Sequence, residues 1–338
     1  MKLAIHHRKG SFSERWIEYC TNEGIAYKIV NAFDSDIINQ IEDCDAFLWH
    51  HHHSDFKDVL TAQRILFALE HSGLKVFPDF RTAWHFDDKV AQKYLLEAIR
   101  APLVPSYVFY DKTEAINWIK KTSYPKVFKL KGGAGASNVK LIKNQSKAIN
   151  LVNIAFGKGF PQFDTWQNLK DRIEKFRRGK DTFKGLIKGV GRLFIKTDYA
   201  KLKSNEKGYV YFQDFIANNS FDTRVVVVAN KAVAERRFVR NNDFRASGSG
   251  RFDYNDINID CVKVAFEVAE RLKLQSVAFD FVENAEGKPL IVEMSYGFGT
   301  KGIKQAPGYW DIMLQWHEKQ FSPEEWILDS INKSFEKY

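Results

Sequence analysis

Two acidic residues near the C-terminal end of the chain, Asp280 and Glu293, stand among apolar neighbours. With residues 284–287 as a four-residue hairpin turn, Asp280 faces Ile291, and Glu293 lies two positions further along on the same face of the sheet. Diagonal neighbours lie about 7 to 8 Å apart, and two buried carboxylates at that distance repel each other unless a cation lies between them. The pattern predicts a divalent-cation site; the alternative is an exposed sheet face with two solvated acids.

A lysine inside an apolar segment precedes a run of small residues. Lys129 alternates with Val127, and residues 132–137 read Gly-Gly-Ala-Gly-Ala-Ser. Small residues in a turn between two strands let backbone N–H groups close over phosphate oxygens, and a lysine at a buried position indicates an anionic partner. The alternative is an ordinary tight turn. The spacing of a P-loop is absent, so that fold is not indicated.

Three arginines form the third group. With Asn230-Lys231 as a two-residue turn, Arg224 faces Arg237 across a strand pair, which is destabilising unless an anion or an acidic side chain neutralises them. Glu235, diagonal to Arg224, is the structural candidate for that role. Arg245 is followed by Ala-Ser-Gly-Ser-Gly, a composition that suits a loop around phosphate or carboxylate as well as it suits a mobile surface loop.

The elements that must position these groups are of two kinds. In the N-terminal third, short apolar runs alternate with helical patterns, which is typical of a parallel sheet covered on both faces. The expected strands are 2–7, 26–31, 45–50 and 75–78, and the expected helices are 13–22 and 61–72. This block reads as a small Rossmann-like unit. The run Trp49-His50-His51-His52-His53 follows one of its strands and is expected to line a substrate cleft rather than to bind zinc, because adjacent residues in extended chain point to alternate faces.

The remainder of the chain mixes helices with strand pairs. Helices are expected at 87–99, 113–121 and 258–272, and strands at 106–109, 126–130, 138–142, 209–216, 223–229, 232–239, 276–283 and 288–294. The aromatic segment 308–318 is expected to cover the site or to pack as a helix.

Composition bounds the function. The 338 residues suit two or three subdomains, no apolar run approaches the roughly 18 to 20 residues needed to span a bilayer, and the polar start does not resemble a signal peptide. Three isolated cysteines favour a reducing compartment, so a cytoplasmic location is expected.

The net charge of +9 predicts anionic partners, but most of the excess positive charge lies in residues 170–207, which argues against nucleic acid as a partner. This basic stretch reads as a solvated helix, as a lid over an acidic substrate, or as a site for an anionic membrane or polyanion.

Taken in order, these groups resemble the ATP-grasp superfamily, and in particular the branch of carboxylate–amine ligases that attach glutamate to proteins or small acids. Asp88-Lys89 at the start of a helix is similar to the first ATP lysine, and Lys129 to the second, with Gly133 in the phosphate flap. The hinge that grips adenine is similar to Gln213-Asp214-Phe215-Ile216. The resemblance further assigns Asp222 to the ribose and phosphate side, Arg224 and Arg245 to stabilising the acyl-phosphate, and Asp280, Glu293 and Ser295 to the metal.

The resemblance has two departures. Ser295 stands where the family has asparagine as the last metal ligand, and Ser247 stands where asparagine is common. A serine hydroxyl is a poorer hard-oxygen ligand than an amide carbonyl. The departure at Ser295 leaves room for a kinase that phosphorylates a hydroxyl, and a non-catalytic nucleotide-regulated binding protein is a third reading. Retention of Asp280 and Glu293 counts against the third.

The resemblance therefore implies a chain of mixed α/β and α+β class, an ATP-grasp fold with an N-terminal Rossmann-like domain. The expected domains are 1–85 (Rossmann-like), 86–320 (ATP-grasp, divided into 86–142, a basic insert at 143–208, and 209–320 with the metal site) and a tail at 321–338. It implies ATP and Mg²⁺, or Mn²⁺ in its place, as cofactors. The expected substrate is an anionic small molecule, glycan or peptide, and a homodimer is left open.

Overall fold

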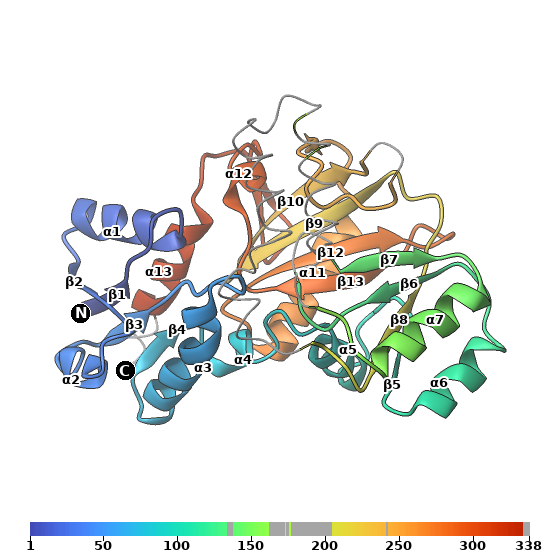
Figure 1. Ribbon diagram of the computed structural model, residues 1–338. Coiled ribbons are helices and arrows are strands. Elements are labelled where there is room, and N and C mark those ends of the chain that lie inside the picture. The colour runs from blue at the N-terminus through green and yellow to red at the C-terminus, as the bar shows by residue number, and fades with distance from the viewer. Residues whose placement is uncertain (134–137, 162–172, 174–175, 177–204, 241–242, 334–338) are drawn as a thin grey trace. The chain divides into compact units, whose positions relative to one another are not determined.

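The structure, a computed structural model, describes residues 1–133, 138–161, 173, 176, 205–240 and 243–333 (Figure 1). The chain forms two compact units. The first unit comprises residues 1–86, 95–103 and 218–338, and the second unit comprises residues 87–94 and 104–217. Between them the chain passes through α5 (Lys89–Ala98). None of the described helices is long and apolar enough to cross a membrane.

The N-terminal part of the first unit is a four-stranded parallel sheet of order β2-β1-β3-β4, as the alternating pattern predicts. Side chains of Ser11 and Asp55 cap the two long helices by accepting hydrogen bonds from their first-turn N–H groups, which fixes where each helix begins. The elements are β1 (Lys2–His6), α1 (Phe12–Asn22), β2 (Ala26–Val30), α2 (Ile37–Gln40), β3 (Ala46–Leu48), α3 (Phe56–His71), β4 (Lys75–Phe77) and α4 (Phe80–Ala83).

The C-terminal part of the first unit is a second sheet of order β13-β12-β9-β10-β14-β15, with β11 paired to β10. Its strands are β9 (Phe221–Val228), β10 (Lys231–Phe238), β11 (Phe252–Asp253), β12 (Ser276–Glu283), β13 (Pro289–Ser295), β14 (Tyr309–Asp311) and β15 (Trp316–His317). Its helices are α11 (Ile259–Leu272), α12 (Thr300–Ile303) and α13 (Pro323–Lys333). Segment 308–318 is thus a hairpin at the sheet edge, and the helix expected there is wrong.

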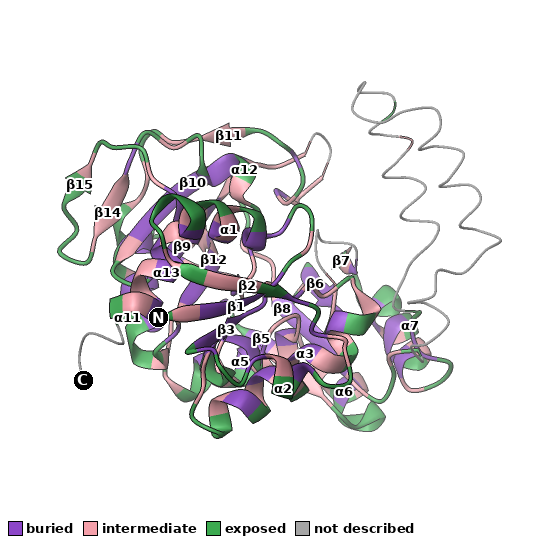
Figure 2. Cartoon of the chain, turned by 90° about the vertical axis from the view of Figure 1, so that its left-hand side faces the viewer, coloured by how far each residue is buried: buried purple, intermediate pink, exposed green. Residues whose placement is uncertain are grey.

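The central strands of this sheet carry a core on each face (Figure 2). Val225, Val227 and Phe279 pack with α11 on one face. On the other face, Val226 and Ala278 share a cluster with residues of β1 and α1. Because successive residues of a strand point to opposite faces, β9 reads as a continuous valine run rather than as an alternating one.

Two predicted strand registers are wrong. The turn between β9 and β10 is Ala229-Asn230, with Ala229 at φ 50°, so Arg224 faces Glu235 instead of Arg237. In the hairpin of β12 and β13, Phe281 pairs with Ile291 and Asp280 with Glu293, because a bulge between these two pairs adds Val292 to β13. A bulge adds one residue to one strand, so every pair beyond it is shifted.

The second unit contains an antiparallel sheet of order β5-β8-β6-β7. Its strands are β5 (Ser106–Phe109), β6 (Lys126–Lys129), β7 (Val139–Ile142) and β8 (Val210–Asp214), and its helices α6 (Lys112–Ile119) and α7 (Gln145–Ala155). Phe128 and Phe212, on neighbouring strands, pack with both helices in one buried cluster. The predicted strands at 126–130 and 138–142 are confirmed as the pair β6–β7.

Candidate active site

Six charged residues lie on one face of the sheet in the first unit, because they are paired across neighbouring strands and paired residues share a face. Arg224 is opposite Glu235 on one side and Asp280 on the other. The remaining two pairs are Asp222 with Arg237, and Asp280 with Glu293. The members of this charged face are therefore Asp222 and Arg224 on β9, Glu235 and Arg237 on β10, Asp280 on β12 and Glu293 on β13.

Asp280 is held by two arginines. Arg224 donates to both of its carboxylate oxygens, from Nε at 2.8 Å and from Nη2 at 3.0 Å. Arg237 lies 2.7 Å from Oδ2 of the same carboxylate and makes two further bonds, at 2.7 and 2.6 Å, to Asp222. Burial opposes the negative charge of Asp280, but the two guanidinium groups outweigh it and hold the pKa of this carboxyl well below its usual value. The prediction that Asp280 stands among apolar side chains is therefore wrong, because its carboxylate contacts Arg224 and Arg237.

The oxygen groups assigned to a metal come together at the end of β13. Residues directly opposite on antiparallel strands have Cβ atoms about 4.5 to 5.5 Å apart, so Asp280 and Glu293 are closer than the diagonal arrangement predicted. Ser295 donates from its hydroxyl to the carbonyl oxygen of Gly297 at 2.7 Å, which leaves the lone pairs of Oγ available.

These groups fit a magnesium ion that also takes ligands from a substrate. Among the described residues no group of three or more His, Cys, Asp or Glu could hold a metal ion. Mg²⁺ is commonly held by one or two carboxylates together with phosphate oxygens and waters, rather than by a cage of protein ligands. Two hard carboxylates and a hydroxyl satisfy that pattern, although Asp280 would share its oxygens with the arginines.

Glu235 is a buried carboxyl that lacks a full set of partners. Its side chain is 2% exposed, and Oε2 has no hydrogen-bond partner in the part of the chain that the structure describes. A Cβ added to Gly302 would lie 2.1 Å from this oxygen, so α12 closes over it. Burial raises the pKa of Glu235 to about 7, against the opposing influence of Arg224 and Arg237.

Replacing Glu235 with glutamine is expected to remove a pH-dependent loss of stability. Folding raises the pKa of this carboxyl from 4.5 to about 7. The protonated carboxyl therefore stabilises the folded state fully below pH 4.5, and this stabilisation is lost as the pH rises through about 7. Relative to wild type, the variant should gain unfolding free energy on the order of 3 kcal/mol between about pH 5 and about pH 8. Urea unfolding at both pH values measures this gain. An offset between the two proteins that is the same at both would show that Glu235 titrates normally.

The second unit holds the predicted ATP lysines. Lys89 and Lys129 are each 4% exposed, and Lys89 donates from Nζ to the carbonyl oxygen of Gly133 at 2.9 Å. Asp87 accepts from the N–H of Gly133 at 2.8 Å, and Gly133 has a φ of 113°, which favours glycine. The start of α5 is therefore tied to the start of the small-residue loop. Loop residues 134–137 lie outside the described residues.

The predicted adenine hinge begins with the last two residues of β8. Gln213 is buried and donates to the hydroxyl of Ser106 at 3.1 Å, whereas Asp214 accepts from Lys126 at 2.6 Å. Phe215 and Ile216 continue beyond the strand and are half-buried. Lys126 was missed by the sequence reasoning, although a lysine at the start of an apolar strand was a usable signal for a buried ion pair.

Comparison with known proteins identifies the fold. A family model for the RimK-like ATP-grasp domain matches residues 184–313. The structure also resembles that of a RimK domain ATP-grasp protein from Sphaerobacter thermophilus DSM 20745, with a TM-score of 0.54 and 19% sequence identity over 87% of this chain and 90% of that one. The chain has the ATP-grasp fold.

Two further solved structures of ATP-grasp type cover almost the whole chain. D-cycloserine synthetase DcsG matches with a TM-score of 0.58 and 13% identity over 98% of this chain and 99% of its own. The ATP-grasp ligase PsnB, complexed with a minimal precursor, matches with a TM-score of 0.55 and 14% identity over 98% of each chain. The resemblance to the ATP-grasp superfamily is therefore confirmed, and its structural neighbours are ligases. No curated protein matches the chain by sequence.

Within this ATP-grasp fold, the loop after β10 positions Arg245. Asp243 accepts from Nε of Arg245 at 2.8 Å and lies 2.7 Å from its Nη2. Arg240 donates from Nε to the carbonyl oxygen of Ser247 at 2.9 Å, which closes the loop on itself. No role was predicted from the sequence for Arg240 or Asp243, because neither matches a motif. Most of the basic stretch 170–207 lies outside the described residues, so its three readings stay predictions.

Proposed function

We propose that this chain is an ATP-dependent ligase that activates a substrate carboxylate as an acyl-phosphate and transfers the acyl group to an amine. The observation that carries the proposal is the pairing of Asp280 with Glu293, beside Arg224 and Arg237, on an ATP-grasp sheet. Opposed acids flanked by arginines suit chemistry in which a cation and a phosphoryl group meet.

The residues that the family resemblance assigns would bind ATP and the metal. Lys89, Lys129 and Gly133 would contact the phosphates, and the hinge residues Gln213, Asp214, Phe215 and Ile216 the adenine. Asp222 would lie on the ribose side, and Asp280, Glu293 and Ser295 would hold Mg²⁺. When bound, the divalent cation would offset the negative charge that develops as the phosphoryl group moves.

The proposed reaction balances in two steps. A carboxylate oxygen of the acid bonds to the γ-phosphorus of ATP while the bond from that phosphorus to the bridging oxygen of ADP breaks. The amine nitrogen then bonds to the acyl carbon, the bond from that carbon to the phosphate oxygen breaks, and the nitrogen loses a proton. Arg224 uses Nε and Nη2 for Asp280, so its other N–H groups would face the acyl-phosphate, together with Arg245.

The substrate would be an anionic small molecule, glycan or peptide. Similarity to a D-cycloserine synthetase and to a ligase complexed with its precursor supports a small molecule or a peptide. A cytoplasmic location belongs to the same proposal, and the free, buried thiols of Cys20, Cys44 and Cys261 support it, because reduced thiols persist in a reducing compartment.

The test is ADP release by the purified protein with Mg-ATP against a panel of acids, each with and without amines. The proposal expects release that requires an acid and an amine together. Release with an alcohol alone would replace the ligase by a kinase. No release with any pair, while ATP still raises the melting temperature, would favour a nucleotide-binding protein.

A further inference from the structure

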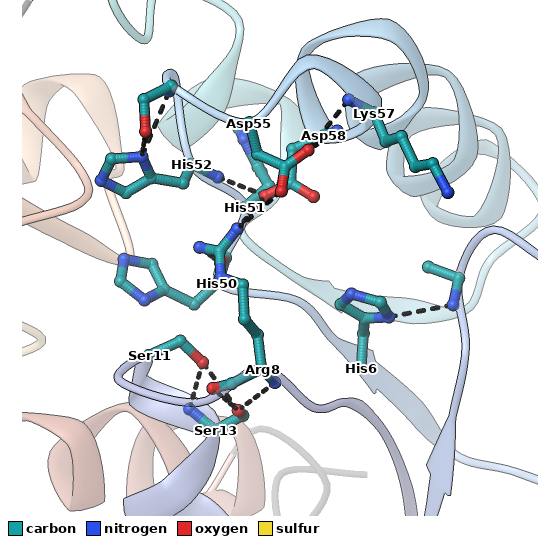
Figure 3. A network of polar contacts seen from close by, with 12 residues as sticks. His6, Arg8, Ser11, Ser13, His50, His51, His52, Asp55, Lys57 and Asp58 are labelled. Atoms are coloured by element: carbon teal, nitrogen blue, oxygen red, sulfur yellow. Dashed lines mark hydrogen bonds and ion pairs between the residues drawn. The ribbon is translucent and has the colours of Figure 1, made fainter. Parts of the chain in front are cut away.

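A polar cluster lies at the carboxyl ends of β1 and β3, which are neighbours in the parallel sheet of the first unit (Figure 3). Arg8 follows β1, and His50 and His52 follow β3. In open parallel sheets the region beyond the carboxyl ends of the strands is where ligands bind. The nucleotide and metal residues named above lie on other elements, so the proposed reaction leaves this cluster unassigned.

Arg8 is held firmly but keeps free donors. Its Nη1 donates to Asp58 at 2.6 Å, and its Nη2 donates to the carbonyl oxygen of His50 at 3.2 Å. The Asp58 side chain is 1% exposed and also accepts from the N–H of His52 at 2.7 Å, so it cannot swing away. A guanidinium group has five N–H donors. The two bonds above use two of them, and Nε has no partner among the described residues.

Two histidines are fixed in one tautomer. Nδ1 of His50 accepts from the backbone N–H of Phe12 at 3.1 Å, and Nδ1 of His52 accepts from the N–H of Ser54 at 3.1 Å. Both rings must therefore carry their proton on Nε2 when neutral. Burial lowers the pKa of His52 to about 4 and that of His50 well below its usual value, so both are neutral near pH 7. Figure 3 shows the two rings projecting to the same side.

The groups left over on Arg8, His50 and His52 are all N–H donors. They are the remaining hydrogens of Arg8 and the Nε2–H groups of His50 and His52. An ionised carboxylate or a phosphate has only acceptors, so it is the complementary ligand. The N-terminal ends of α1 and α3, the helices that follow the loops after β1 and β3, add a positive potential. Asp58 balances Arg8, and Asp55 caps α3 through Oδ1 while its Oδ2 lies 3.8 Å from Nη1 of Arg8.

The cluster adjoins the strand end that carries Ser295. The ring of His50 stacks on Phe12 with centroids 3.6 Å apart, which directs it firmly. A Cβ on Gly297 would lie 3.3 Å from Nε2 of His50, and Gly297 accepts the hydrogen bond from Ser295. One molecule can therefore reach from the end of β13 to the ends of β1 and β3.

We propose that Arg8, His50 and His52 form a subsite for a second oxyanion, a carboxylate or a phosphate, of the acid that this chain activates. The inference rests on the proposed ligase function and narrows its substrate to acids with two anionic groups. Asp58 is a positioning residue that acts through Arg8.

The test is calorimetric binding, without nucleotide, of glutarate, 3-phosphonopropionate and pentanoate. Wild-type protein should bind at least one of the two dianions about 10-fold or more tightly than pentanoate, and the stronger of them identifies the oxyanion. Arg8→Gln should weaken that binding by about 10-fold to 100-fold and leave pentanoate unchanged. Lys9→Gln is the matched control, since it removes an exposed charge from the neighbouring residue. His52→Ala, which leaves the Arg8–Asp58 pair intact, should also weaken it.

Equal affinity of wild-type protein for the dianions and for pentanoate would overturn the proposal. So would equal losses in Arg8→Gln and Lys9→Gln. If Arg8→Gln does not fold, dianion binding by the His52→Ala variant is the test. Binding as tight as that of the wild-type protein would overturn the subsite. Calorimetry without nucleotide is independent of the assay for ADP release. Dianion binding in the first, with no ADP release in the second, would refute the ligase and keep the subsite. Ligase activity on simple monoacids would do the reverse.

Discussion

Replacing Glu293 with glutamine is expected to reduce ATP turnover by about 100-fold or more. Glutamine keeps the size of the side chain but removes one of the two opposed carboxylates, Asp280 being the other. A bound divalent cation is worth several kcal/mol of transition-state stabilisation, and each 1.36 kcal/mol is a factor of ten in rate. Steady-state ADP release with saturating Mg-ATP measures the loss.

The fold should not suffer from this change. Like charges directly opposite each other are destabilising, so without metal the Glu293→Gln variant should melt at the same temperature as wild type or higher. Glu286→Gln is the control, because Glu286 is exposed in the turn of the same hairpin. A variant at Glu293 that turns over ATP as fast as the Glu286 control would remove Glu293 from the metal site.

Replacing Arg237 with methionine is expected to lower the free energy of unfolding by about 3 to 5 kcal/mol. Arg237 is 4% exposed and bridges Asp222 and Asp280. Without it, Asp280 keeps Arg224, but Asp222 loses both of the hydrogen bonds described above and becomes an uncompensated, largely buried charge. Urea unfolding near pH 7 measures the effect.

Arg236→Met provides the matched control on the opposite face of β10. Arg236 pairs with Asp253, and its side chain is 16% exposed against 5% for that of Arg237, so its removal should cost less than about 1 kcal/mol. Adding Asp222→Asn to Arg237→Met should recover part of the loss, because the buried charge is then absent. Equal destabilisation by Arg236→Met and Arg237→Met would show that the buried network contributes no more to the free energy of unfolding than the Arg236–Asp253 pair does.

Several elements were predictable because their signals are local. The parallel sheet near the N-terminus follows from apolar runs of strand length, and the pair β6–β7 follows from two apolar runs separated by small residues. Helix α11 follows from a spaced apolar face. Helix α7 was not predicted, although its apolar residues have the spacing of a helix.

Strand registers were less predictable because they depend on one or two backbone angles. The pair Asn230-Lys231 has the composition of a tight turn, but Ala229 adopts a positive φ and moves the turn by one residue. That shift exchanges the expected Arg224–Arg237 contact for two pairs of opposite charge. The bulge at Val292 is not indicated by any residue type in the sequence, yet it places Asp280 opposite Glu293.

By itself the sequence determined the ATP-grasp fold, the lysines and acids proposed for its site, and the order in which they occur, since residue type and strand pattern are carried by the chain itself. Only the tertiary structure decided which charges meet. Asp280 with two arginines, Glu235 buried opposite Arg224, and Arg8 fixed by Asp58 join residues 11 to 56 positions apart. Such contacts arise from strand pairing and chain packing, and no short stretch of sequence encodes them.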